Sequence, residues 1–188
     1  MKNYLCLMLM AIFAFSVSCD KIKDATAVDI ETDLSFEIPV ESTGQSALVA
    51  KSGNLATTAF QFGGNATFSL SDNDDIADYV NKIDDIIVSG VSKIQIVDVP
   101  SGGKISNCKL MYGVDPNAGT TGFNITTELN AANGIIEITD KEWVNQFIIL
   151  LKQNKTGRFK FVVTGESSYD IQSVMKIKVP VLIEANAL

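Results

Sequence analysis

A strict alternation of apolar and polar side chains over residues 28–40 constrains the fold more than any other feature of this chain. Successive side chains of an extended strand point to opposite faces of a sheet, so this period of two predicts a long strand with one buried and one wet face. The apolar positions are Val28, Ile30, Leu34, Phe36, Ile38 and Val40, with Thr32 continuing the same phase.

More strand-like segments follow, each bounded by Gly, Pro, Ser or Asn. Gly63-Gly64 predicts a β-bulge, and Asn133-Gly134 predicts a hairpin turn. Pro39 and Pro180 lack an N–H to donate, which predicts that the first and last strands lie at sheet edges. The segments are 47–51, 57–70, 88–99, 107–112, 123–129, 135–139, 159–163 and 175–183.

Two segments have helical periodicity instead, residues 72–86 and 140–154. Each follows a cap signature, Ser71 with Asp74 in the first and Thr139 with Glu142 in the second. The segments align at a fixed offset, which leaves open whether the chain is an internal duplication or simply has two capped amphipathic helices.

This order of elements favours a mainly β fold. We expect an antiparallel β-sandwich of about nine strands, with the two short helices covering one end or opening of the sheets. An α+β layered fold is the alternative.

The N-terminus reads as a secretion signal and not as part of the fold. Lys2 precedes an apolar run from Tyr4 to Phe15, and Ser16-Val17-Ser18 stand ahead of Cys19. The run is shorter than the roughly 20 residues of a membrane-spanning helix. The alternative is an ordinary signal peptidase site, with Cys19 there by coincidence.

Residues Ser16 to Cys19 resemble the lipobox of bacterial lipoproteins, in the looser form familiar from Bacteroidota, with Ser16 where Leu is usual. The resemblance implies cleavage before Cys19 and attachment of diacylglycerol and a further fatty acyl chain such as palmitate to that residue. It therefore implies a lipid-anchored protein of the cell envelope, at the outer membrane in preference to the inner one.

The expected organisation is a signal peptide (1–18), the lipidated cysteine with a short polar tether (19–27), and one β domain (28–188). Removal of Lys2 with the signal takes the net charge from −7 to −8, which disfavours nucleic acid and anionic lipid as partners. Cys6 leaves with the signal and Cys19 carries lipid, so Cys108 has no disulfide partner and is expected in the core.

The chain contains no histidine, which removes the usual general base and the imidazole metal ligand. Its 22 acids could supply the carboxylate pair of a glycosidase, but no spacing selects a pair. The acidic stretch from Asp72 to Asp85 lacks an EF-hand pattern, because Ala77 stands where the glycine is expected. Asp84 and Asp85 come late for a helix, where negative charge is unfavourable. We expect no catalytic residue, metal or cofactor.

Two aromatic residues are the candidates for ligand contact. Tyr112 precedes the loop 113–122 and Tyr169 lies in the turn 167–170, where a ring could stack on a sugar. Trp143 falls on the apolar stripe of its helix and is expected in the core.

Three functions remain open. The first is a non-catalytic, membrane-anchored binding or structural module for a protein or glycan ligand. The second is a carboxylate-based hydrolase of polysaccharide or peptidoglycan. The third is an assembly subunit in which the strands at 28–40 and 175–183 accept a partner's strand by β-augmentation.

Overall fold

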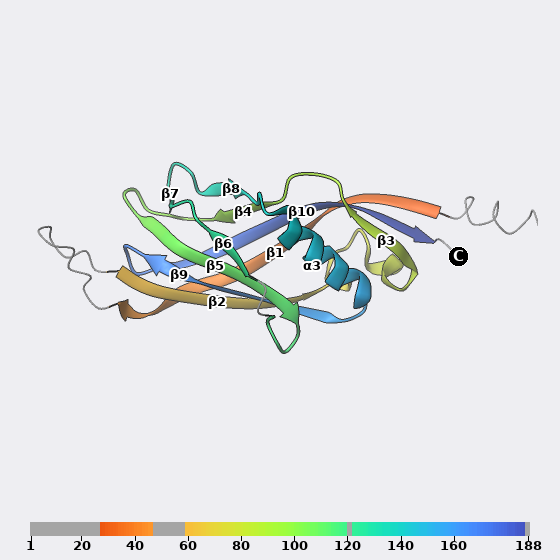
Figure 1. Cartoon of the computed structure of the whole chain (residues 1–188), viewed down its shortest axis with the longest axis horizontal. Coiled ribbons are helices and arrows are strands. Elements are labelled where there is room, and N and C mark those ends of the chain that lie inside the picture. The colour runs from red at the N-terminus through yellow and green to blue at the C-terminus, as the bar shows by residue number, and fades with distance from the viewer. Residues whose placement is uncertain (1–26, 47–58, 120–121, 187–188) are drawn as a thin grey trace, which may run out of the picture.

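The computed structural model describes residues 27–46, 59–119 and 122–186 (Figure 1). The strand predicted at 47–51, the proposed signal and Cys19 lie outside these residues. The elements in chain order are β1 (Ala27–Ser46), β2 (Ala59–Ser69), the 3-10 helices η1 (Leu70–Asp72) and η2 (Ala77–Lys82), β3 (Ile83–Val88), β4 (Lys93–Ile96), β5 (Lys104–Val114), β6 (Gly122–Ile125), β7 (Leu129–Asn130), β8 (Ile135–Glu137), α3 (Lys141–Gln153), β9 (Arg158–Ser167) and β10 (Gln172–Asn186).

The mainly β, antiparallel class predicted from the sequence is confirmed. The ten strands of the described residues belong to one sheet, with the order β6-β5-β9-β2-β1-β10-β4-β8, while β3 pairs with β10 and β7 with β5. The layering differs from two separate sheets of a sandwich, because one continuous sheet curls. The segment 129–137 bridges its two sides, since β7 pairs with β5 and β8 with β4.

The core lies between the inner face of this sheet and α3. The alternation in β1 buries Leu34, Phe36, Ile38 and Val40 on the inner face, as predicted. Helix α3 confirms the helix predicted at 140–154, but its N-cap is Asp140 and not Thr139, since the Asp140 carboxylate accepts the hydrogen bond from the Trp143 amide. Its Phe147 ring packs against aromatic rings from four strands, namely Phe36, Phe68, Tyr112 and Phe161.

The prediction that β1 and β10 are edge strands is wrong for the sheet as a whole, since β10 pairs with β1 and with both β3 and β4. Each proline nevertheless lies at a position where its strand is paired with a neighbouring strand on one side only. Pairing of β1 with β2 begins only at Val40, so Pro39 has no strand partner on that side. Pro180 falls between the stretch of β10 that pairs with β4 and the stretch that pairs with β3.

The helix predicted at 72–86 is wrong. Two 3-10 helices occupy its first part, and residues from Ile83 onward form β3. β4 pairs with β10 only from Met175 to Lys178, which leaves the stretch of β10 from Val181 to Ala185 open to another strand. The apolar residues Ile83, Ile86 and Val88 suit a strand that pairs there. Asp84 and Asp85 are therefore strand residues, and Asp85 forms an ion pair with Lys152 of α3.

Two local turn predictions are also corrected. The bulge lies in β1, between Ser42 and Gly44, and Gly63 and Gly64 pair in register with both neighbouring strands. The segment at Asn133-Gly134 is a turn that joins β7 to β8 without a hairpin, because these strands pair with β5 and β4 and not with each other.

Candidate functional site

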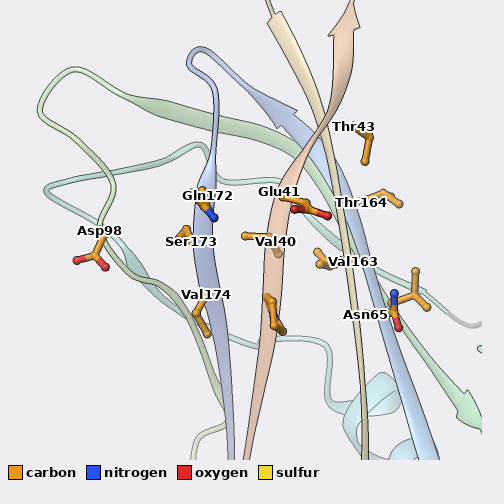
Figure 2. Close-up of a pocket in the computed structure, with 14 residues that line it drawn as sticks. Val40, Glu41, Thr43, Asn65, Asp98, Val163, Thr164, Gln172, Ser173 and Val174 are labelled. Carbon is orange, nitrogen blue, oxygen red and sulfur yellow. The ribbon is translucent and has the colours of Figure 1, made fainter.

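The outer face of the sheet carries a hollow of about 780 Å³ where β10, β1, β2 and β9 lie side by side (Figure 2). Alternation along β1 places Pro39, Glu41 and Thr43 on this face, opposite the phase that fills the core. Gln172 and Val174 of β10 form one wall and Thr164 of β9 contributes to the other, and the loop after β4 brings Asp98 to the rim.

Two adjacent glycines of β2, Gly63 and Gly64, are among the residues that line the hollow. A Cβ on Gly64 would stand 2.1 Å from the carbonyl oxygen of Pro39, so this position must be glycine for β1 and β2 to approach. A Cβ on Gly63 would meet only Thr43 Cγ2 at 3.5 Å and the Val163 oxygen at 3.7 Å, which are ordinary contacts. The fold therefore explains Gly64 and does not explain Gly63.

Several polar side chains around the hollow have unused hydrogen-bonding capacity. Within the described residues, the side chains of Glu41, Asn65, Thr164 and Gln172 form no hydrogen bond or ion pair with another residue. The Thr43 hydroxyl donates to the Gln61 carbonyl at 3.4 Å, and the Ser173 hydroxyl donates to the Val97 carbonyl. The open side of the hollow thus presents free amide, hydroxyl and carboxylate groups.

The charge of the hollow is negative. Its lining includes the carboxylates of Glu41 and Asp98 and contains no Lys or Arg. Strand β10 lies between these two carboxylates (Figure 2), so they do not form a closely spaced pair. Asp98 has a φ of 57°, in the left-handed region that Asp tolerates better than most residues.

The tyrosines expected to face a ligand do not line this hollow. Tyr112 is only 5% exposed, and its hydroxyl donates to the backbone oxygen of Trp143 at 3.0 Å. The covered ring of Tyr112 therefore offers no open stacking face, while Tyr169 is half-buried against the core, with a buried hydroxyl. Trp143 lies in the core, as predicted.

Cys108 is buried in the core, which confirms the prediction made from its sequence context. Burial raises the pKa of its thiol from 9.0 to about 12. A thiol in this environment stays protonated at neutral pH and is a poor nucleophile.

The acidic stretch after β2 serves the fold. The Asp72 carboxylate accepts from the Ser69 amide in a capping box, and Asp75 accepts from the Thr32 hydroxyl at 2.6 Å. The Lys152 side chain, which hydrogen-bonds the Asp85 carboxylate, lowers the pKa of that group. Among the described residues, no three Cys, Asp or Glu side chains converge on a point where a metal ion could be held.

The comparisons with known proteins leave the family open. No family model matches the sequence, and no curated protein matches it. Among solved structures, a chain of Desmodium yellow mottle tymovirus aligns with 86% of this chain and 84% of its own length, at 13% identity and a TM-score of 0.28. Similarity this low carries no inference about function. No helix in the described part of the chain is both long and apolar enough to cross a bilayer.

Sequence reasoning did not locate the hollow. Its residues come from four strands and a loop that are far apart along the chain. Alternation predicts which side chains of a strand face outward, but it does not predict which strands lie next to one another. The one local signal was Gly63-Gly64, since glycine in a strand interior marks either a bulge or a close approach of another group. The bulge interpretation was wrong, and close approach is the alternative that remains.

Proposed function

We propose that this protein is a lipid-anchored lipoprotein of the bacterial envelope whose β domain is a non-catalytic binding module. The observation that carries the anchoring is the run Ser16-Val17-Ser18-Cys19 after an apolar stretch too short to span a membrane. The first described strand begins at Ala27, so only a short tether would separate the domain from the lipid. The outer membrane is the proposed location.

The hollow on the outer face supports a binding role. It is open, it is built from rigid paired strands, and it presents polar side chains that have no partner within the described residues. Sites on paired strands hold their side chains more firmly than sites on loops, which favours recognition. The ligand would be a protein or a glycan of the envelope or of the surroundings.

The alternative of a carboxylate-based hydrolase gains no support from this site. A glycosidase needs two carboxyl groups facing each other about 5–10 Å apart across the scissile bond. Glu41 and Asp98 lie on opposite sides of β10 (Figure 2), so the two carboxylates do not face each other directly across the hollow.

The anchor is tested by the mass of the N-terminal peptide and by metabolic labelling with a palmitate analogue. The expected result is a peptide that begins at acylated Cys19, with labelling abolished in a Cys19→Ser variant. A matched Cys108→Ser variant should keep the label. An unmodified peptide beginning at Cys19 or elsewhere would contradict the anchoring.

Protease treatment of intact cells tests which way the domain faces. Digestion of the domain with the acylated peptide retained would show exposure at the cell surface, and protection would show a periplasmic domain. Recovery in the soluble fraction, with no membrane association, would contradict the proposed location.

A further inference from the structure

We propose that the hollow on the outer face binds a short, uncharged glycan. This inference rests on the proposed binding function and names the class of its ligand. Three observations support it: the glycine at position 63, the polar side chains around it that have no partner within the described residues, and the strands beneath it, whose backbones are already paired on both sides.

Gly63 is the position that the fold does not require. Glycine weakens a strand interior because it contributes no packing and loses more backbone entropy than other residues. The neighbours of Gly63 leave room for a side chain, unlike the Pro39 oxygen that confronts Gly64. The missing side chain at Gly63 leaves space in the hollow for something that is not part of this chain.

The groups around that space match the chemistry of a sugar. Asn65 and Gln172 carry amides, and each amide can donate and accept at once, as pairs of neighbouring hydroxyls require. Thr164 adds a hydroxyl and Glu41 adds an acceptor. Val162 and Val174 supply apolar surface for the C–H groups of a ring.

The charge of the site narrows the class of sugar. Glu41 and Asp98 are carboxylates with no Lys or Arg in the lining to balance them. An anionic sugar such as a uronic acid, or a phosphorylated one, would be repelled by both. A neutral glycan accepts hydrogen bonds from the amides and donates to the carboxylates.

The backbone beneath the hollow argues against an added peptide strand. At Val40 and Glu41, β1 is paired with β2 on one side and with β10 on the other. Gly63 and Gly64 are likewise paired with both β1 and β9. Addition of a strand needs a free row of backbone groups, so at this point the sheet has only side chains to offer.

Binding is tested with the full chain, purified from the cell fraction in which it is recovered and in detergent if that fraction is the membrane, by calorimetric titration with neutral oligosaccharides of glucose, mannose, galactose and N-acetylglucosamine. Oligogalacturonate serves as the anionic comparison. We expect one or more neutral oligosaccharides to bind and oligogalacturonate not to bind. A Gly63→Val variant, which fills the hollow with a side chain suited to a strand, should weaken binding at least about tenfold.

Two further variants separate loss of the site from loss of the fold. Asn124→Val places the same side chain at an exposed position of β6, outside the hollow, and should bind as the unaltered protein does. Asn65→Ala removes an exposed amide that has no partner within the described residues, so it should leave the melting temperature unchanged and weaken binding about threefold or more.

Three results would overturn the proposal. Binding of no neutral oligosaccharide in the panel would refute it, as would binding that survives both Gly63→Val and Asn65→Ala. Capture of a polypeptide at this hollow, abolished by Gly63→Val, would refute the glycan class and leave the binding function standing. None of these results depends on the acylation of Cys19, so failure of the anchor and failure of the glycan site are distinguishable.

Discussion

The α-carbon of Gly64 lies directly against the carbonyl oxygen of Pro39, so close that a Cβ at this position would stand 2.1 Å from that oxygen. The contact marks where β1 and β2 part, because their pairing runs from Ser46 back to Val40 and stops before Pro39. The adjacent Gly63 has no such neighbour. Two glycines that look alike in the sequence therefore have different reasons for being glycine.

Gly64→Ala is expected to lower the free energy of unfolding by about 1–3 kcal/mol, because a backbone oxygen cannot move away as a flexible side chain can. Gly63→Ala is the matched control and should change it by less than about 0.5 kcal/mol. Urea denaturation of both variants measures the difference. Equal destabilisation would show that Gly63 is also required by the fold.

Tyr112→Phe should destabilise the domain by about 1 kcal/mol, because it removes the hydrogen bond from the Tyr112 hydroxyl to the Trp143 oxygen and leaves that buried region one donor short. Tyr169→Phe deletes a buried hydroxyl that has no partner within the described residues, so it should be neutral or slightly stabilising. Trp143 is the single tryptophan of the chain, and its fluorescence reports unfolding in both variants. An equal loss in the two would contradict the assigned hydrogen bond.

Cys108 predicts a loss of stability in alkali. The folded protein keeps the thiol proton up to a pKa of about 12, whereas the unfolded chain releases it near 9.0. The stabilisation is therefore complete below pH 9 and falls as the pH rises toward 12, by up to about 1.4 kcal/mol per unit. Denaturation between pH 9 and 10 measures this, since the pKa of Tyr112 rises from 10.0 and contributes above that range.

Cys108→Ala is the control for this pH dependence, and the comparison is between slopes because the variant also leaves a small cavity. Its stability should change less between pH 9 and 10 than that of the unaltered protein. Equal slopes would show that other groups cause the alkaline loss.

The two segments with the same cap pattern show what the sequence could and could not predict. At 140–154 local signals and tertiary packing agree, since Trp143, Phe147 and Leu151 all point into the core, and the helix forms as expected. At 72–86 the apolar spacing fits a helix equally well, but Ile83–Val88 forms a strand because it pairs with an open edge of β10. The sequence does not show where that edge lies. The predicted caps are also wrong, since Ser69 caps η1 in place of Ser71 and Asp140 caps α3 in place of Thr139, so the pattern common to both segments does not demonstrate duplication.

The prolines and the tyrosines also show that local sequence rules do not predict which elements lie next to a residue. Pro39 and Pro180 both lie in the ladder between β1 and β10 and have no strand partner on their other side, so a strand can be unpaired over part of one side and still lie inside a sheet. Tyr112 follows a run of apolar residues beside a glycine-rich loop, and only the position of α3 decides that its ring is covered. Alternation identifies the face of each strand, whereas the hollow depends on which strands are neighbours.

The pairing of the first strand with the last has a consequence for how the chain reaches its native state. Residues 27–41 of β1 pair with residues 172–186 of β10, and the two outer ends of this pair lie at the same end of the molecule (Figure 1). Contacts between such distant parts of a sequence make loop closure costly and folding slow. A chain is synthesised from its N-terminus, so β1 is without its main partner until β10 has also been made. During that interval β1 would expose a long apolar face, and chaperones that bind extended strands would be expected to protect it from aggregation.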